Sequence, residues 1–302
     1  MMRAFRLGLF VAAAIVSVAA AAVETGPVAT TPEARWFKLG KLKLAALHDG
    51  GFVAANDGKI IGQDAGPEAV AKVLAAAGVP TDRLALSVNT LLVKLPGRTV
   101  LIDSGLGPAK GMLTASLAAA GMTPGEITDV LITHSHGDHV GGLATADGKP
   151  AFPNAVVRMA AAEWAWMKTM PGAAALVAAI GSQVKTFEPG AVIAPGIRSV
   201  AIEGHTPGHV GYEVGVASTR LLDIGDTAHS SIVSLGKPDW TMGFDNDKAQ
   251  GKISRRATLA RLAATRELVF APHFPFPGVG RIVVAGDGFA WAPETLQPLP
   301  TR

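Results

Sequence analysis

The chain has 302 residues, of which 49% are hydrophobic and 17% are charged, and its formal net charge at pH 7 is +3. This length and apolar share allow one large domain with a sizeable core and exclude a chain that is disordered throughout. The charge is too small to predict a nucleic-acid surface, and the absence of cysteine excludes disulfides and thiolate metal ligands.

The first 22 residues have the pattern of a secretory signal peptide. Arg3 and Arg6 precede an uncharged apolar run at 7–18, and the small residues 20–22 offer a cleavage site. The run is alanine-rich and short for a membrane span, so we expect a cleaved signal, a secreted or periplasmic protein, and no stable membrane anchor. Loss of the two arginines would reduce the net charge from +3 to +1.

The next segment, 23–35, contains Thr, Pro and Gly without periodicity, and we expect an extended leader there. A single domain is expected over 36–302, since no Gly/Ser-rich linker interrupts it. Alternating apolar positions and turn residues predict its first elements: hairpins at 37–46 and 87–103, helices at 67–77 and 109–120, a turn at 48–51, and a helix start at Thr123.

The rest of the chain is predicted to alternate between strands and helices. The expected strands are 130–133, 156–159, 197–202, 211–216, 220–224 and 268–271, followed by a closing hairpin at 281–291. The expected helices are a stretch through Trp164 and Trp166 and a second one at 254–265. Interleaved strands and helices predict an α/β domain.

A six-residue cluster after the strand at 130–133 combines three histidines with one aspartate: His134-Ser135-His136-Gly137-Asp138-His139. In an extended segment, His134, His136 and Asp138 would point one way and His139 the other. A turn at Gly137 would create two adjacent pockets, because glycine permits the backbone to turn there. The first two histidines would then serve one pocket and the last two ligands the other, so the cluster predicts two metal ions.

Three further candidate ligands follow predicted strands, at positions where functional loops are often built. His205 comes after the strand at 197–202, Asp226 after 220–224 and His273 after 268–271. Nitrogen and carboxylate ligands without cysteine favour a borderline or hard divalent ion. We expect two such ions, zinc first, with manganese, iron and cobalt as alternatives.

The motifs at 133–142, 204–209 and 225–227 and the late His273 resemble, in this order, those of the metallo-β-lactamase superfamily. The resemblance covers essentially the whole mature chain. It implies a four-layer αββα sandwich with the site at one edge of the two sheets. It also implies one metal on His134, His136 and His205, a second metal on Asp138, His139 and His273, and Asp226 as a bridge between them.

The flanking segments 152–157 and 276–281 resemble methyl parathion hydrolase and its secreted relatives, whereas the quorum-signal lactonases match them less well. This likeness implies a metal-dependent hydrolase that acts on ester bonds. Two metals about 3.5–4 Å apart can share a water and lower its pKa, and the resulting hydroxide would attack the substrate. Asp226 and Asp138 are the catalytic carboxylates in this interpretation.

Organophosphate triesters or aryl esters are the first substrate choice. The alternatives are an acyl lactonase and a catalytically decayed binding protein of the same fold. Tyr212, the only tyrosine, is not assigned the active-site role that a tyrosine has in the lactonases, which argues against a lactone-specific enzyme. The expected partner is a small ester or lactone and not a nucleic acid, and a homodimer is one compatible assembly.

Further residues are candidates for positions around the metals. Asp103 is expected to satisfy buried backbone or to orient a ligand. His209 is predicted to brace the turn that holds His205, and His229 either lines the pocket or caps a loop. Phe274 and Phe276 are expected near the site because they adjoin His273, and aromatic side chains can wall an apolar pocket. Trp164, Trp166 and Phe244 are additional candidates for that wall.

Overall fold

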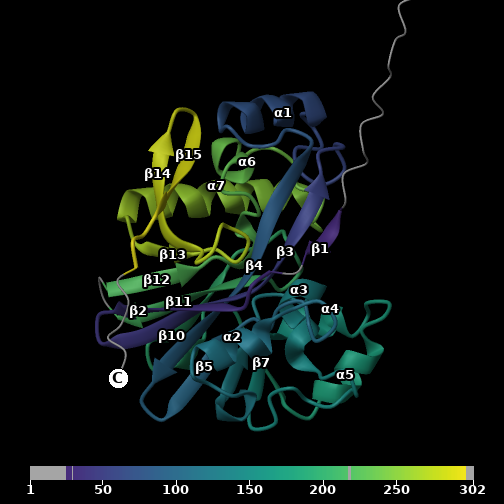
Figure 1. The fold of residues 1–302 in the computed structure, drawn as a ribbon, viewed down its shortest axis with the longest axis vertical. Helices are drawn as coiled ribbons and strands as arrows, with labels where there is room; N and C mark the ends of the chain where they lie inside the picture. Colours follow the sequence, from purple (N-terminus) through teal and green to yellow (C-terminus); the bar gives the residue numbers. More distant parts are fainter. Residues whose placement is uncertain (1–24, 29, 217–218, 297–302) are drawn as a thin grey trace, which may run out of the picture.

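The computed structural model describes residues 25–28, 30–216 and 219–296 (Figure 1). The predicted signal peptide at 1–22 lies outside these residues. Within the described ranges, no helix has the length and apolar character needed to cross a membrane.

The first sheet contains eight strands, ordered β1-β3-β4-β5-β6-β7-β8, with β2 paired to β3. Neighbours from β5 to β8 are parallel, and the other pairs are antiparallel. The strands are β1 (Gly26–Val28), β2 (Glu33–Leu39), β3 (Leu42–Ala55), β4 (Arg83–Leu95), β5 (Arg98–Ile102), β6 (Asp129–Leu131), β7 (Val156–Ala160) and β8 (Val184–Phe187).

The second sheet contains seven strands in the order β15-β14-β13-β12-β11-β10-β9. Only the β12–β13 pair is parallel among its described neighbours. The strands are β9 (Val192–Ala194), β10 (Ile197–Ala201), β11 (Val210–Val216), β12 (Thr219–Asp223), β13 (Leu268–Phe270), β14 (Val279–Ala285) and β15 (Gly288–Pro293).

The helices connect and cover these sheets. The α-helices are α1 (Pro67–Ala76), α2 (Leu113–Ala119), α3 (Gly137–Val140), α4 (Ala161–Met167), α5 (Ala174–Ile180), α6 (Val233–Gly236) and α7 (Lys248–Thr265). The 3-10 turns are η1 (Pro124–Glu126), η2 (Gly141–Leu143) and η3 (Gly225–Thr227). Figure 1 shows α2, α4 and α5 on one flank of the molecule and α6 and α7 on the other.

The two sheets pack face to face. Their shared core contains Leu91 of β4 together with Leu221 of β12. The next residue of each strand points to the opposite face: Leu92 packs under α2, α4 and α5, and Leu222 packs under α7. Both faces of each sheet are therefore buried, and the predicted αββα sandwich is confirmed.

Most predicted strands and the helix at 67–77 are found within a few residues of their expected bounds. The expected turn at 48–51 is wrong: β3 continues through it, with a bulge between His48 and Gly50. Glycine and aspartate can serve a bulge as well as a turn, and only the pairing partners distinguish the two. The expected leader also belongs to the sheet, since it contributes β1 and the first residues of β2.

Two predicted helices are shorter than expected. The helix at 109–120 begins only at Leu113, because the preceding residues form a loop beside β3. The helix start at Thr123 leads into the single turn of η1, although Thr123 and Glu126 form a capping box there.

Candidate metal centre

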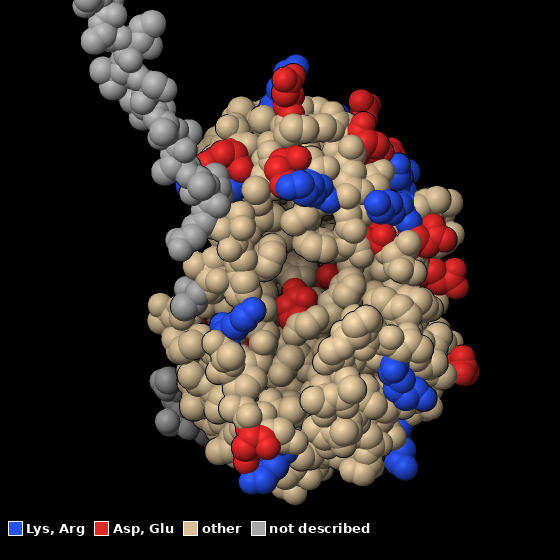
Figure 2. Space-filling view, turned by 90° about the vertical axis from the view of Figure 1, so that its right-hand side faces the viewer, with Lys and Arg blue, Asp and Glu red and all other residues tan. Residues whose placement is uncertain are grey.

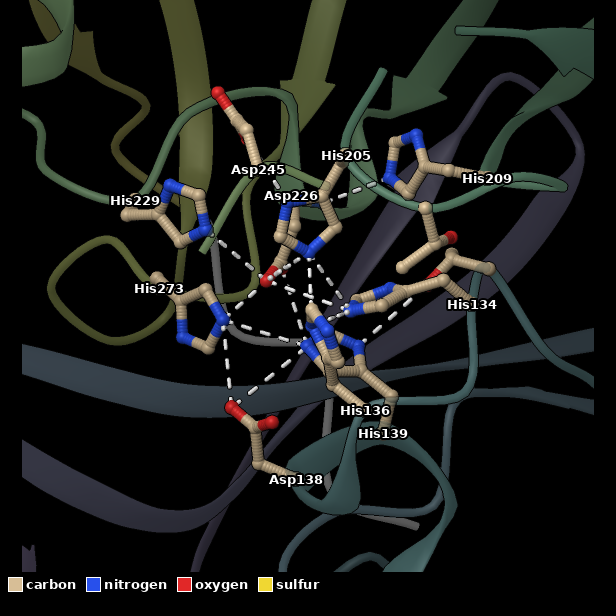
Figure 3. Close-up of polar contacts among 12 residues, drawn as sticks. His134, His136, Asp138, His139, His205, His209, Asp226, His229, Asp245 and His273 are labelled. Atoms are coloured by element: carbon tan, nitrogen blue, oxygen red, sulfur yellow. Dashed lines mark hydrogen bonds and ion pairs between the residues drawn. The ribbon is translucent and has the colours of Figure 1, made fainter. Parts of the chain in front are cut away.

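The histidine cluster lies directly after β6, at one edge of the two sheets. The chain is extended at His136 and turns into α3 at Gly137, so the predicted change of direction occurs where the glycine stands. Beyond it, Asp138 and His139 face a second pocket. Two groups of side chains result, and within each group the potential ligand atoms lie within 4.8 Å of one another: His134, His136, His205 and Asp226 in the first, and Asp138, His139 and His273 in the second (Figure 3).

The members that do not belong to the cluster come from the second sheet. His205 follows β10, Asp226 lies in η3 after β12, and His273 follows β13. The seven residues named from the sequence are thus brought together from both sheets. Asp138 is the most open of the carboxylates, with 29% of its side chain exposed, whereas the side chain of Asp226 is 4% exposed.

In the first group, three imidazole nitrogens converge. His205 Nε2 lies 3.2 Å from His134 Nε2 and 2.9 Å from His136 Nδ1, and the last two atoms are 3.1 Å apart. The other nitrogen of His205, Nδ1, lies 3.0 Å from a carboxylate oxygen of Asp245. That hydrogen bond directs the lone pair of Nε2 into the group.

The second group has the same construction. His139 Nε2 and His273 Nε2 are 3.3 Å apart, and Asp138 Oδ2 lies 3.8 Å from the former and 3.6 Å from the latter. His139 Nδ1 lies 2.8 Å from Asp103 Oδ2, and His273 Nδ1 lies 2.8 Å from the carbonyl oxygen of Ser87. Each Nε2 therefore carries its lone pair toward the group.

Asp226 stands between the two groups. Its Oδ2 is 3.5 Å from His134 Nε2 and 3.3 Å from His205 Nε2. Its Oδ1 is 3.1 Å from His139 Nε2 and 3.0 Å from His273 Nε2. This buried Oδ1 has no hydrogen-bond partner among the described residues. One carboxylate thus presents one oxygen to each group, which is the arrangement of a bridging ligand.

The charges of the site are strongly coupled. Burial alone would raise the pKa of Asp226, but the surrounding histidines hold it well below its usual range. Burial, reinforced by the neighbouring His205, lowers the pKa of His136 to about 4. Burial also opposes the charge of His205, yet its hydrogen bonds to Asp226 and Asp245 raise its pKa to about 9. The site is built to hold positive charge among buried carboxylates.

The donor set fits two divalent cations. Nitrogen lone pairs directed at one another at about 3 Å repel unless a cation or a proton lies between them. Imidazole and carboxylate donors suit zinc and the other first-row divalent ions, and the chain has no thiolate. The Oδ1 of Asp226, which lacks a hydrogen-bond partner among the described residues, and the converging nitrogens form the donor arrangement expected of metal ligands.

Asp103 and His209 hold the ligands from behind. Asp103 accepts hydrogen bonds from the backbone N–H and the hydroxyl of Thr133, each 2.8 Å long, besides its contact with His139. His209 Nδ1 donates to the carbonyl oxygen of Ile202, and its Nε2 accepts from the backbone N–H of Asp226 at 3.0 Å. His209 therefore positions the loop of Asp226 as well as its own turn.

Glu163 of α4 was not singled out from the sequence, although it ties two ligand loops together. Its Oε1 accepts from the N–H and the hydroxyl of Ser135, at 2.7 and 2.6 Å, and its Oε2 accepts from Thr206 Oγ1 and Gly208 N, at 2.7 and 2.9 Å. Its side chain is completely buried. A lone carboxylate in an apolar helix next to two tryptophans was the available signal.

Asp245 and Arg255 were also missed. Asp245 receives the hydrogen bond of His205 and pairs with Arg255 of α7. Arg255 further donates to the carbonyl oxygens of Thr227, Pro238 and Trp240. Adjacent Arg256 is exposed, and the sequence offers no signal that separates the two arginines.

A cavity of about 550 Å³ opens over both groups. Figure 2 shows the hollow with acidic atoms at its base. The base contains His136, Gly137, Asp138, Asp226, His229 and His273, and the walls contain Pro27, Phe52, Leu86, Leu106, Pro108, Ala109, Lys110 and Phe244. His229 Nε2 lies 3.3 Å from Asp226 Oδ2, and neither ring nitrogen of His229 has a hydrogen-bond partner among the described residues.

The expectation that Phe274 and Phe276 wall this cavity is wrong. Phe274 is buried under α7 and meets Trp291 edge-on at 4.9 Å. Phe276 stacks on His48 at 5.0 Å and packs against the core between the sheets. The chain turns away from the cavity immediately after His273. Residues that adjoin a ligand in the sequence therefore do not line the cavity here.

The family and structural relatives agree with this geometry. A family model described as the metallo-beta-lactamase superfamily matches residues 83–289. The solved structure of AidC, a dizinc quorum-quenching lactonase in complex with a product, has a TM-score of 0.83 and 26% identity, and the match covers 88% of this chain and 99% of that one. The hydrolase AbOPH of the beta lactamase superfamily has a TM-score of 0.80 and 27% identity, with 89% and 99% covered.

A human protein, metallo-beta-lactamase domain-containing protein 1, is 41% identical over 49 residues. This segment is 16% of the present chain and spans only 18% of the human protein. The broad match over residues 83–289, together with the shared fold and site, shows that the chain belongs to the metallo-β-lactamase superfamily.

Proposed function

We propose that this protein is a binuclear metal-dependent hydrolase that acts on small ester-type substrates. The observation that carries the proposal is the position of Asp226, with one oxygen toward each of two groups of ligand atoms. The predicted enzyme class, a hydrolase acting on ester bonds, agrees with the family and with the hydrolase and the lactonase among the structural relatives.

In this proposal the first metal is held by His134, His136 and His205, the second by Asp138, His139 and His273, and Asp226 bridges both. Two divalent ions supply an activated water and polarise the bond to be cleaved. Zinc is the first choice for both positions, since the donors suit it. Asp103, His209 and Asp245 fix the ligand side chains and their loops, so the geometry of the site is already set before a substrate binds.

His229 adds a polar group to the cavity beside Asp226. Its ring stacks on that of His273 at 5.8 Å with an interplanar angle of 12°, and it is 1% exposed. The apolar walls favour a substrate with an apolar substituent and exclude water around it. We therefore place the scissile group above Asp226 and the substituent against Phe52, Leu86 and Phe244.

Organophosphate triesters and aryl esters are the first proposed substrates, and acyl lactones are the second. Tyr212 is buried behind the site and donates its hydroxyl to the carbonyl oxygen of Ile132 at 2.8 Å, so it is not available to a substrate. This favours the first choice. The lactonase activity named for AidC, at 26% identity, is the observation that keeps the second. The closer likeness to methyl parathion hydrolase stays a prediction.

The test is a substrate panel measured with purified, metal-loaded protein. We expect turnover of paraoxon-type triesters and aryl esters to exceed that of acyl lactones in kcat/KM. A lactone rate far above the others would reverse the order of the two proposals. Metal analysis distinguishes the hydrolase from a catalytically decayed binding protein. We expect about two metals per chain, as in other binuclear hydrolases. A protein that binds no metal and turns over no substrate would support the binding protein instead.

We also propose that the protein is exported after removal of residues 1–22. The support is the charged start, the apolar run and the small residues at 20–22. N-terminal sequencing of the protein from its natural host should find a mature start just after residue 22. An intact Met1 on the mature protein would contradict this proposal.

A further inference from the structure

One side of the active-site cavity is a loop between β5 and α2. We name residues 105–111 the wall loop. Leu106, Pro108, Ala109 and Lys110 of this loop line the cavity. A second cavity, of about 220 Å³, lies behind the loop and is lined in part by Gly107, Pro108 and Gly111. Pro108 therefore has open space on both sides, whereas at Leu106 and Gly107 the wall loop lies close against Gly141.

Asp49 anchors the wall loop near its start and the chain just beyond its end. Its Oδ2 accepts the backbone N–H of Leu106 at 2.7 Å, and its Oδ1 accepts the backbone N–H of Leu113 at 2.7 Å. Its own carbonyl oxygen accepts the N–H of Met112 at 2.7 Å. The side chain of Asp49 is completely buried. Hydrogen bonds from backbone N–H groups to a buried carboxylate are among the stronger ones in proteins.

Two glycines make room for this carboxylate. A Cβ atom on Gly105 would lie 2.3 Å from Asp49 Oδ2, and a Cβ atom on Gly111 would lie 2.4 Å from Asp49 Oδ1. Gly105 also has a positive φ of 72°. The bulge between His48 and Gly50 takes Asp49 out of the regular pairing of β3 with β4. Strand, loop and carboxylate are therefore fitted to one another.

We infer that Asp49 is a positioning residue that sets the substrate selectivity of this site by fixing the wall loop. The inference rests on the proposed hydrolase function. Asp49 makes no hydrogen bond to any of the seven proposed metal ligands; its side-chain bonds go to the ends of the loop. Its influence would therefore reach the substrate through the part of the cavity wall that Leu106 and Pro108 form, and not through the metals.

The first test is Asp49→Asn. An amide keeps one acceptor oxygen but turns an NH₂ group toward the second backbone N–H, so one end of the wall loop is released. We expect KM for bulky aryl esters or triesters to rise about tenfold, with kcat for a small ester and the metal content within about twofold of the wild type. The matched control is Asp129→Asn. Asp129 is also a buried carboxylate, but its partners are Arg98, Arg158 and Thr128.

Equal changes of KM for small and bulky esters in Asp49→Asn, or a selectivity change of the same size in Asp129→Asn, would overturn the inference. So would loss of metal from Asp49→Asn, because Asp49 would then support the metal centre itself.

A second variant tests the same anchor from the loop side. Gly111→Ala places a methyl group against the Asp49 carboxylate, and the control Gly236→Ala places one where no atom lies within 4 Å. We expect Gly111→Ala to reproduce the selectivity change and Gly236→Ala to leave it unchanged. An unchanged selectivity in Gly111→Ala would contradict the inference.

Hydrogen exchange separates this inference from the proposed function. The amides of Leu106 and Leu113 should both be protected in the wild type, and the one that is left without an acceptor oxygen should lose protection in Asp49→Asn. A wild type that hydrolyses no ester would refute the proposed function and with it the role in selectivity, whatever the exchange data show. An active wild type in which these two amides exchange equally fast before and after the substitution would refute the anchor alone.

Discussion

Asp226 and His209 show how one side chain prepares another. His209 accepts the backbone N–H of Asp226 through Nε2, and this contact requires a neutral ring. Burial and the neighbouring His205 lower the pKa of His209 to about 3, so the ring stays neutral throughout the range in which the protein would work. The residue that bridges the two proposed metal positions is thus held by its backbone while both carboxylate oxygens remain directed at the site.

Substitution of these two residues should give graded losses. Asp226→Ala removes the bridge, so we expect turnover to fall by at least about a thousandfold and metal content to fall with it. His209→Ala removes only a support, and we expect about 10–100-fold loss with most of the metal retained. Steady-state kinetics and metal analysis on both variants check this. Equal losses would mean that His209 acts on the metals directly.

Glu163 offers a second prediction at the scale of single residues. Glu163→Gln leaves one acceptor oxygen for four donors, from Ser135, Thr206 and Gly208. We expect the affinity of the first metal position to fall about 10–100-fold, because its ligands stand on the two loops that Glu163 joins. Metal titration of this variant against Glu188→Gln, whose carboxylate is exposed, measures the effect. Equal affinities would contradict it.

At the scale of elements, α7 contributes to the site from behind through a single buried arginine. Arg255 pairs with Asp245 and so supports the hydrogen bond of Asp245 to His205. Three backbone carbonyl groups also depend on this guanidinium. A helix that touches neither substrate nor metal therefore fixes the orientation of one proposed ligand.

Arg255→Met should destabilise the fold by about 3–5 kcal/mol, since it leaves the buried carboxylate of Asp245 without its cation. Arg256→Met, on the same helix, should leave the free energy of unfolding almost unchanged, because its partner Asp239 and its own side chain are both exposed. Denaturant unfolding of the two variants compares the two arginines directly. Similar unfolding midpoints for the two variants would show that the buried Arg255–Asp245 pair contributes no more to stability than the exposed Arg256–Asp239 pair.

The turn at Gly137 is another feature of element scale. The extended segment ends at His136 and α3 starts at the glycine, so ligands that are neighbours in sequence serve different groups. Alternation of side chains along the segment predicted this division. The bulge in β3 shows the opposite case. The sequence of Asp49 and the two glycines after it predicted a turn, but Asp49 lies in a strand and binds Leu106 of the wall loop, 57 residues further along the chain.

At the scale of the whole molecule, the proposed metal centre joins the two sheets. His134, His136, Asp138 and His139 follow β6 of the first sheet, and His205, Asp226 and His273 follow strands of the second. The ligand atoms of each group come from both sheets. Bound metals would therefore cross-link the two layers, and metal binding is coupled to the stability of the whole fold.

Removal of the metals should lower the thermal midpoint. A ligand present at about a thousand times its dissociation constant stabilises the native state by roughly 4 kcal/mol, which corresponds to about 10 °C for a domain of this size. We expect a chelator to lower Tm by about this amount and added zinc to restore it. The control is Asp226→Ala, whose Tm should respond much less to the chelator. An equal response in both proteins would contradict the proposed bridge.

The sequence by itself determined the class of fold, the order of the motifs and the chemical identity of the seven proposed ligands. These features are local: alternation predicts strands, strand ends predict sites, and the lack of cysteine restricts the donors to nitrogen and oxygen. The division of the cluster into two groups also followed from local geometry, because it depends only on consecutive side chains and one glycine.

Only the tertiary structure decided which groups stand behind the ligands and which side chains face the substrate. Glu163 meets Ser135 and Gly208, and Asp245 meets His205, across 28 to 45 residues of chain. Phe274 lies in a core and Phe276 packs against another one, whereas Phe52 and the wall loop line the cavity. Such contacts depend on how strands and loops are brought together by burial, and no local pattern along the chain contains that information.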